Sequence, residues 1–566
     1  MSRSSADIRV GALGFLFGAW LVGFQNLNPK SLEWLSADAR LAQLGYEFFW
    51  RAPWWQFPID ATSNFGVGWG VGLNQNAYNS LLAFVLKPVA AFFPTGFQFQ
   101  GVWIAACFAL HVVIARKIFA ELRLELRAQL LGVVVVALTP ALFSRIGTLW
   151  HPQLAAHWMI LLAFLMYLRN SRTLWWSIFC VYALSVHVYL FLIVFAVALA
   201  VITKGLLQRN RTESLVQGLR SLALRLAAVV VPVVIALLVF GFGTFLTNSS
   251  VAGVGFFRMN LLAFINPARE EYGYLTSRLA FFVERTWITE ENEGFAYLGL
   301  GAIVAVVSLI IFVLIARVRL GRHHWPLVAA TSALFFVALS ERLAVGGREF
   351  MLPVPDAFIE ARQTVRAATR FAWLALYLLV ILGWWALVSA STRYLKPIVT
   401  TLVLVGVTLL QVVDVGPGVA TLHEEVSRDK GVYAPDLGRQ WSDLFEQYDR
   451  VKIVPSIDPN EDDMDYLPDE REWLADNRLF QLAWLAAFND VKLNYAFCSR
   501  PCVDLARTST TQARLELNDL GLEPGTIYLF STESEWKQMT DILGAPAKKI
   551  DGFFAILGPR TDGSTP

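Results

Sequence analysis

The chain has 566 residues, of which 56% are hydrophobic and 16% are charged, and its mean hydropathy is +0.50. Soluble domains carry roughly 25% charged residues, so this composition excludes an ordinary soluble protein and indicates a membrane body. The net charge of +2 is the sum of a basic part and an acidic part: residues 1–413 contain 32 Lys and Arg against 18 Asp and Glu, and residues 414–566 contain 15 Lys and Arg against 27 Asp and Glu. The basic residues lie in short loops rather than in the single stripe of a nucleic-acid-binding protein.

Apolar stretches predict the membrane-spanning helices, because a span needs about 20 mostly apolar residues. Residues 78–95 are apolar but interrupted by Lys87 and Pro88, and we interpret them as a juxtamembrane helix. Residues 173–203 are too long for one span, and we expect two short helices that meet near His187. Both interpretations keep the basic loops on the cytoplasmic side. The clear candidates for spans are 9–26, 101–117, 129–147, 151–168, 225–246, 296–316, 325–341, 371–390 and 397–413.

The charges of the loops predict how the chain is oriented. With eleven spans and a cytoplasmic N-terminus, 18 Lys and Arg but only four acids fall in the inner loops. The fold class is therefore a polytopic α-helical membrane protein, residues 1–413, followed by an extracytoplasmic soluble domain, residues 414–566. Long ordered loops are usually functional, so we expect the active surface on the outer face. The long outer loops are 27–100, 247–295 and 342–370.

The first outer loop contains the main candidate for a catalytic base. Ser36 is the predicted N-cap of a short amphipathic helix whose first turn contains Asp38. The helix dipole would keep Asp38 ionised and available as a base, although an Asp here also simply favours the helix N-terminus. Glu47 and Asp60 are rival bases; we expect Glu47 to face solvent or pair with Arg51, and Asp60 lies in a turn that it could equally cap. The predicted apolar side of the helix holds Leu41, Leu44, Phe48 and Phe49.

An Asp shortly after the first span, followed by an aromatic and Pro-rich stretch and a juxtamembrane helix, resembles the C superfamily of membrane glycosyltransferases (GT-C), and more closely a bacterial group within it. In that group a His often follows the Asp by about four residues, but Ala42 and Gln43 occupy this region here, so any role of that His is absent or moved. The matching pieces are WLSADARLAQLGYEFFWRAPWWQFPI at 34–59, GFFRMNLLAFINP at 255–267, EGFAYLGLGA at 293–302, RQTVRAATRFAWLALYLL at 362–379 and LAAFNDVKLNYAFCSR at 485–500.

The resemblance implies inverting transfer of a sugar from a polyprenyl phosphate to a glycan, lipid or protein acceptor, at the outer face of a bacterial cytoplasmic membrane. Such a reaction needs a carboxylate base, for which we assign Asp38, and cationic groups for the departing lipid phosphate, which arginines supply without a metal or other cofactor. Arg362, Arg366 and Arg370 have the i, i+4, i+8 spacing of one helical face and are our phosphate-binding candidates. The alternative is an external salt-bridge set with Glu349, Asp356 or Glu360.

Three further residues are candidates for substrate binding. Arg258 in the second long loop could bind phosphate, although such an Arg more often anchors a loop. His151 and His187 are expected at outer helix ends, where a histidine could contact sugar or phosphate but usually bonds a backbone carbonyl. The outer loops of the membrane body contain no Asp-x-Asp cluster, so the sequence does not predict a metal site there. Two other classes of function stay open: a transporter or flippase of lipid-linked glycans, for which acids in the spans and an internal repeat would be typical, and a non-catalytic envelope-assembly protein.

The soluble domain mixes strand and helix patterns, which predicts an α/β or α+β fold. It contains no nucleophile elbow or phosphate loop, and we expect it to bind acceptor or partner or to cover the active cleft. Cys498 and Cys502 could form a disulfide if the domain is extracytoplasmic. The predicted strands are Val451–Pro455, Thr526–Phe530 and Phe553–Leu557, and the predicted helices are 439–449, 474–488 and 511–519.

Overall fold

A computed structural model of the chain divides into two compact units. The first, which we call the helical unit, consists of Met1–Asn28, Phe99–Ala236 and Ser250–Arg428. The second, the mixed unit, consists of Pro29–Gln98, Leu237–Ser249 and Asp429–Pro566. The structure describes residues 3–67, 71–147, 151–208, 215–242, 258–267, 277, 293–316, 321–355, 359, 367–428, 437–454, 478–495, 516–530, 533–562 and 564.

Six helices within the described residues are long and apolar enough to cross a membrane. The bent pair α6 (Leu126–Ala137) and α7 (Pro140–Ile146) would make a seventh span. The prediction of eleven spans is thus not confirmed and stays a prediction, because several of the remaining apolar helices are shorter than a span. The six are α1 (Arg3–Val22), α5 (Gln100–Glu121), α10 (Val188–Leu207), α11 (Leu215–Val239), α15 (Ala372–Tyr394) and α16 (Pro397–Ser427); the shorter ones are α8 (Trp158–Leu168), α9 (Thr173–Val186), α12 (Leu300–Ala316) and α13 (Trp325–Leu339).

Two of the predicted apolar stretches are broken in the structure. The break expected near His187 is confirmed, since α9 ends at Val186 and α10 begins at Val188, but α10 has 20 residues rather than being short. The span predicted over 129–147 is instead divided, because Pro140 opens α7 at an angle of 45° to α6.

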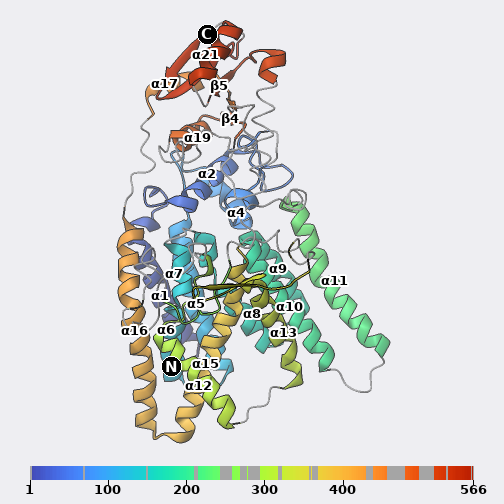
Figure 1. Ribbon diagram of the computed structural model, residues 1–566, viewed down its shortest axis with the longest axis vertical. Coiled ribbons are helices and arrows are strands. Elements are labelled where there is room, and N and C mark those ends of the chain that lie inside the picture. The colour runs from blue at the N-terminus through green and yellow to red at the C-terminus, as the bar shows by residue number, and fades with distance from the viewer. Residues whose placement is uncertain are drawn as a thin grey trace. The chain divides into compact units, whose positions relative to one another are not determined.

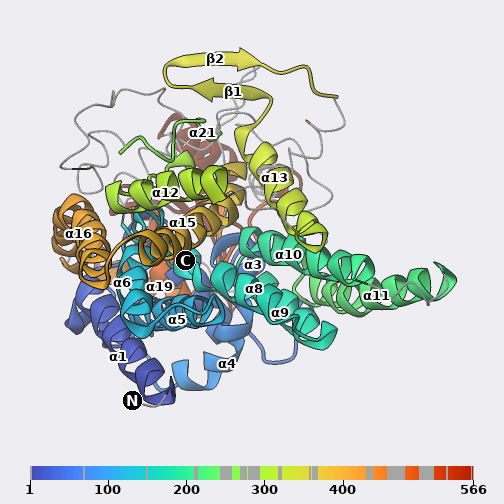
Figure 2. The same ribbon diagram turned by 90° about the horizontal axis from the view of Figure 1, so that it is seen from below.

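Small residues allow the long helices of the helical unit to pack closely. A Cβ at Gly18 of α1 would lie 2.7 Å from the Cα of Ala105 in α5, and one at Gly383 of α15 would lie 2.9 Å from the backbone of Ala305 in α12. These helices accordingly lie side by side in both views of the structure (Figure 1, Figure 2). Small residues at such contacts are typical of membrane helix packing, where van der Waals contact replaces the hydrophobic drive.

A buried carboxylate fixes the start of α12. Asp414 of α16 is fully buried and accepts hydrogen bonds from the Leu300 backbone N–H at 2.9 Å and from the Tyr297 hydroxyl at 2.8 Å. The hydroxyl of Ser277 donates to its other oxygen. Asp414 thus satisfies donors at the N-terminus of a helix, where backbone N–H groups lack partners within the helix.

The mixed unit contains a five-stranded sheet with the order β4-β3-β5-β7-β6. β3 is parallel to β4 and β5, whereas β7 is antiparallel to β5 and β6. The three predicted strands are confirmed; β4, β6 and α21 were not predicted. The elements are β3 (Arg450–Val454), β4 (Lys492–Leu493), β5 (Thr526–Phe530), β6 (Ala547–Ile550), β7 (Phe553–Leu557), α17 (Arg439–Phe445), α19 (Arg478–Phe488) and α21 (Glu533–Leu543).

The first long loop of the sequence belongs to the same unit as the C-terminal region. Phe65 forms a parallel bridge to Leu493, and the Val67 backbone N–H donates to the Leu493 carbonyl at 2.8 Å, so this loop extends the sheet beyond β4. The guanidinium of Arg51 lies 3.9 Å from the ring centre of Phe488 in α19. The helices of the loop are α2 (Ala37–Arg51), α3 (Leu73–Asn76) and α4 (Ser80–Ala90).

Helix α2 confirms the predicted start after Ser36 with Asp38 in its first turn. The expectation that Glu47 faces solvent is wrong: the side chain is 1% exposed, although it does pair with Arg51. Gln43 and the Phe97 backbone N–H also donate to it, at 3.0 and 2.9 Å. Burial raises the pKa of Glu47, while Arg51 and these donors oppose the shift. Cys498, Cys502 and the start of the predicted helix 511–519 lie outside the described residues.

Candidate functional site

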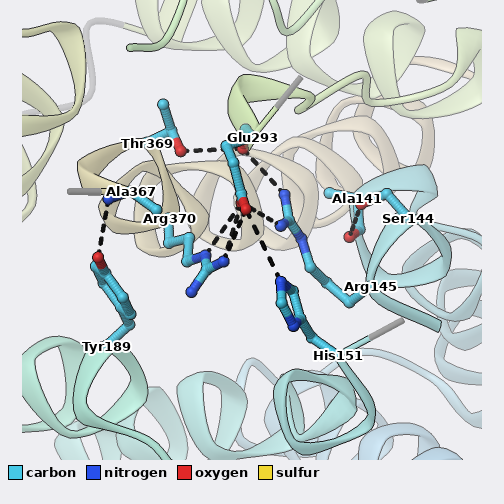
Figure 3. Close-up of polar contacts among 9 residues, drawn as sticks. All are labelled: Ala141, Ser144, Arg145, His151, Tyr189, Glu293, Ala367, Thr369 and Arg370. Atoms are coloured by element: carbon cyan, nitrogen blue, oxygen red, sulfur yellow. Dashed lines mark hydrogen bonds and ion pairs between the residues drawn. The ribbon is translucent and has the colours of Figure 1, made fainter. Parts of the chain in front are cut away.

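Three segments of the helical unit that are far apart in sequence meet at one carboxylate (Figure 3). Glu293 Oε2 accepts from Arg145 Nη1 at 2.6 Å, and Glu293 Oε1 accepts from Arg370 Nη2 at 3.0 Å. Arg145 Nη2 also donates to the backbone carbonyl of Glu293 at 3.0 Å. The two guanidinium groups therefore hold both the side chain and the main chain of Glu293.

A second ring of residues surrounds this ion pair. His151 Nε2 lies 3.9 Å from Glu293 Oε1, and the Thr369 hydroxyl donates to the Glu293 carbonyl at 2.9 Å. The Arg370 guanidinium carbon lies 4.7 Å from the ring centre of Tyr189, a cation–π contact. We call Arg145, His151, Glu293, Thr369 and Arg370 together the Glu293 cluster.

Local sequence explains how each element presents its residue. Pro140 starts α7 and sets the bend that brings Arg145, in its last turn, to the cluster. A 3-10 turn over Ala368–Phe371 precedes α15 and presents Thr369 and Arg370 from adjacent positions. Gly294 lies so close to the Arg258 carbonyl that a Cβ would be 2.6 Å from that oxygen, so only glycine allows the approach that places Glu293.

The cluster is buried at its cationic core and more open at its rim. The side chains of Arg145 and Arg370 are 0% and 7% exposed, whereas those of Glu293 and His151 are 12% and 21% exposed. Burial alone would raise the pKa of Glu293, but Arg370, Arg145 and His151 together hold it well below its ordinary value. Glu293 is thus a carboxylate at neutral pH and a poor proton acceptor, and its chemical role is to orient the two guanidinium groups.

The comparisons with known proteins identify the family. Residues 11–416 match DUF6311, a domain of unknown function, and residues 440–558 match the DUF6311 C-terminal domain. The chain belongs to the DUF6311 family. No curated protein matches it. The family description names no activity, so the function of this DUF6311 chain has to be argued from its sites.

The structure brings together three of the residues predicted to bind substrate. Arg370 and His151 both contact Glu293, and the ring of His187 lies 5.4 Å from that of Tyr189, over which the Arg370 guanidinium lies. The imidazole of His187 accepts a hydrogen bond from the Tyr189 backbone N–H at 3.3 Å, at the start of α10. Arg362 and Arg366 lie outside the described residues.

Two other predicted residues are not members of the Glu293 cluster. Arg258 pairs with Glu349 at 2.8 Å, and Arg342 shares that carboxylate at 3.2 Å, which is the loop-anchoring arrangement considered as its alternative role. Arg370 pairs with Glu293, which was not among the acids expected to neutralise it. Asp38 is exposed and belongs to the mixed unit, whereas the Glu293 cluster belongs to the helical unit.

Arg145 and Glu293 were not among the predicted site residues. Arg145 is the only ionisable residue in the apolar stretch 129–147, and such residues within candidate spans are a signal of function. Glu293 opens the piece EGFAYLGLGA that supports the resemblance. No group of three or more His, Cys, Asp or Glu side chains is gathered as a metal site in the described part of the chain.

Proposed function

We propose that this DUF6311 chain is an inverting glycosyltransferase that takes a sugar from a polyprenyl phosphate, and that the Glu293 cluster binds the phosphate of that donor. The observation on which the proposal depends is the convergence of Arg145 and His151, from one stretch of the chain, with Arg370, from a remote one, at a point that is buried on its cationic side and partly open at His151. A guanidinium has five N–H donors in a fixed fork, so one group can bridge a carboxylate and a phosphate.

The proposed reaction balances without a metal. The acceptor hydroxyl oxygen attacks the anomeric carbon, the bond from that carbon to the phosphate oxygen breaks, and the departing polyprenyl phosphate keeps the electron pair. The developing negative charge is stabilised by Arg145 and Arg370, which are already oriented by Glu293 and so need little reorganisation. The hydroxyl proton passes to a carboxylate base.

We assign the base to Asp38. Its exposed position in the first turn of α2 suits a group that meets an acceptor, and the low pKa of Glu293 makes that residue unsuited to the task. The acceptor would be a glycan, lipid or protein at the outer face of a bacterial cytoplasmic membrane, with the N-terminus in the cytoplasm and the C-terminal domain outside. Arg258, Arg362, Arg366 and His187 are further proposed contacts of the donor.

A carrier of lipid-linked glycans is the second candidate, and a buried polar line in the helical unit favours it. His157 Nδ1 lies 2.7 Å from the Tyr377 hydroxyl, and the ring centres of His111 and Tyr377 are 5.4 Å apart. All three side chains are fully or almost fully buried. Ionisable groups at such depth often line a transport path.

The decisive experiment is a transfer assay with purified chain in proteoliposomes, using a panel of radiolabelled polyprenyl-phosphate sugars. We expect Arg145→Gln and Arg370→Gln each to lower transfer about 100-fold or more, the scale seen when an oxyanion-stabilising donor is removed. The matched control is Arg116→Gln, because Arg116 is also buried and pairs with a carboxylate, that of Asp7. Thermal unfolding of each variant shows whether it is folded.

The same assay tests the base and separates the two candidate functions. Asp38→Asn should abolish transfer but retain donor binding, while Asp60→Asn should retain transfer. Movement of the donor across the liposome bilayer without product would identify a carrier instead. Equal activity of folded Arg370→Gln and Arg116→Gln would refute the role of the cluster.

A further inference from the structure

A second buried polar site lies in the mixed unit, and it is independent of the proposed function. Asp60, Asn74 and Asn79 are each no more than 2% exposed. Within the described residues, Asp60 Oδ1, Asn74 Oδ1 and both amide atoms of Asn79 have no hydrogen-bond partner. Buried polar atoms in native proteins are bonded in the great majority of cases, so four such atoms in neighbouring turns require a specific explanation.

The remaining contacts of Asp60 fix the direction of its unpartnered oxygen. Oδ2 accepts from the Ser80 hydroxyl at 2.9 Å and from the Asn74 backbone N–H at 3.2 Å. The Asp60 carbonyl accepts from the Leu73 N–H at 2.9 Å, which ties the turn to the start of α3. The carboxylate is therefore held from one side, and Oδ1 is left on the other.

Asn74 directs an oxygen to the same place. Its Nδ2 donates to the Phe240 carbonyl, and this bond determines that Oδ1 rather than the amide nitrogen faces Asp60. A Cβ at Gly72 would lie 3.0 Å from Asp60 Oδ1 and 3.3 Å from Asn74 Oδ1. Two oxygens thus lie close to the same side of Gly72, and while Asp60 is ionised neither can donate a hydrogen bond, so a positive species beside them would give both a partner.

Asn79 is the chain neighbour of a residue that bonds Asp60, and its own amide oxygen is buried without a partner among the described residues. This asparagine is the N-cap residue of α4 but makes no capping hydrogen bond with its side chain, and the next residue, Ser80, contacts Asp60 directly. An N-cap Asn normally accepts from the first turn of its helix, so the unused side chain indicates another task. Carboxylate and amide oxygens are the donors preferred by hard cations.

The charge of the site selects the class of cation. The groups that act on the ionisation of Asp60 are Ser80 and backbone N–H groups, none of which is cationic. One monovalent cation would neutralise the single carboxylate, whereas a divalent cation would leave a buried net positive charge, which is costly in a medium of low dielectric constant. We propose that Asp60, Asn74 and Asn79 bind a sodium ion that joins the 58–80 segment to the chain at Phe240.

The test uses the purified full chain in detergent and follows thermal unfolding at pH 8. Sodium chloride is compared with choline chloride at constant ionic strength. We expect the Tm of the wild type to rise by a few degrees in sodium, because a ligand that binds the folded form stabilises it by mass action. Asp60→Asn should abolish this response, while Asp38→Asn, which removes an exposed carboxylate of the same unit, should keep it.

A second variant covers the case in which Asp60→Asn fails to fold. Gly72→Ala retains all three ligand side chains but introduces a methyl group close to both oxygens, and it should weaken the sodium response. Broadening of the ²³Na resonance by the wild type, reduced in Gly72→Ala, would support the site directly. Three results would overturn it: a wild-type Tm identical in sodium and choline, a Tm that responds to pH alone, which would mean a shared proton, or a larger response to calcium or magnesium than to sodium.

Discussion

The substitution Glu293→Gln separates the charge of the cluster from its shape. Glutamine keeps the size and the backbone carbonyl of Glu293, which would still accept from Arg145 and Thr369 at 3.0 and 2.9 Å. What is lost is the carboxylate that faces two guanidinium groups, of which Arg145 is 0% and Arg370 is 7% exposed. The variant therefore measures how much that carboxylate contributes to the free energy of unfolding.

The structure sets the expected size of the effect. Removing one partner of a buried ion pair costs about 3–5 kcal/mol, because the other charge stays buried without compensation. We expect the lower end, about 3 kcal/mol, since Glu293 is 12% exposed and its main-chain bonds persist. The pKa of Glu293 is held well below 4.5, so this stabilisation is fully present above pH 4.5 and is lost only as the pH falls through the lower folded-state value. Hence the measurement belongs at neutral pH.

Thermal unfolding in detergent measures the loss, and the chain offers a matched control. Glu349 also bridges two arginines, Arg258 and Arg342, but it is 32% exposed, so Glu349→Gln should cost about 1 kcal/mol or less. For Glu293→Gln we expect a Tm lower by roughly 2–4 °C, from about 2 cal/mol/K of unfolding entropy per residue. Inorganic phosphate should restore more Tm to Glu293→Gln than to Glu349→Gln, because it can replace the missing anion. If the two variants unfold alike and ignore phosphate, the Glu293 cluster is not an anion site.

Three further predictions concern single positions. Burial raises the pKa of Asp60 from 3.8 to about 7, so its contribution to stability is complete below pH 4 and is lost by pH 7. In sodium-free buffer the free energy of unfolding of the wild type should therefore fall by about 4 kcal/mol across this range, and that of Asp60→Asn should not. Chemical unfolding at each pH measures both. Gly101→Ala should cost about 1–3 kcal/mol, because its Cβ would overlap the Asn26 backbone, whereas Gly406→Ala, with nothing within 4 Å, should be neutral or stabilising by Tm. Asp414→Ala should cost about 2–4 kcal/mol by leaving buried donors without an acceptor, and a Tm equal to that of the wild type would contradict its role at the start of α12.

Local patterns in the sequence were sufficient for many elements of the fold. The strands at 526–530 and 553–557 were predicted to the residue, because each is a short run of β-branched and aromatic residues between turns. The break at His187 followed from the length of its apolar stretch and the basic residues at both ends. By contrast, β4 has two residues and the edge strand β6 contains Lys548 and Lys549, and strands that are so short or so charged give little signal.

Burial of charge was harder to predict than secondary structure. Glu47 was expected to face solvent or to pair with Arg51, because it lies roughly opposite Asp38 on the helix; the pair with Arg51 is present, but the carboxylate is buried rather than solvent-facing. Asp60 was expected in a turn that it could cap, but its carboxylate is buried against Ser80 and Asn74, and the Asn74 side chain bonds the carbonyl of Phe240, which is remote in sequence. In both cases the side chain is buried by residues outside the short stretch of sequence from which the prediction was made.

The sequence indicates that Arg145 needs an acidic partner, but it does not identify which acid that is. An ionisable residue in an apolar stretch requires a partner, and the stretch 247–295, which we predicted as a long outer loop, holds six acids that could supply one. Nothing in their spacing distinguishes these acids. Glu293 is selected because Gly294 lets the chain approach the carbonyl of Arg258, and this close contact between two backbones exists only in the folded unit. The residue that orients the arginines is thus specified by its small neighbour, and Gly294→Ala should displace Glu293 and reproduce the loss of stability in Glu293→Gln without any change of charge.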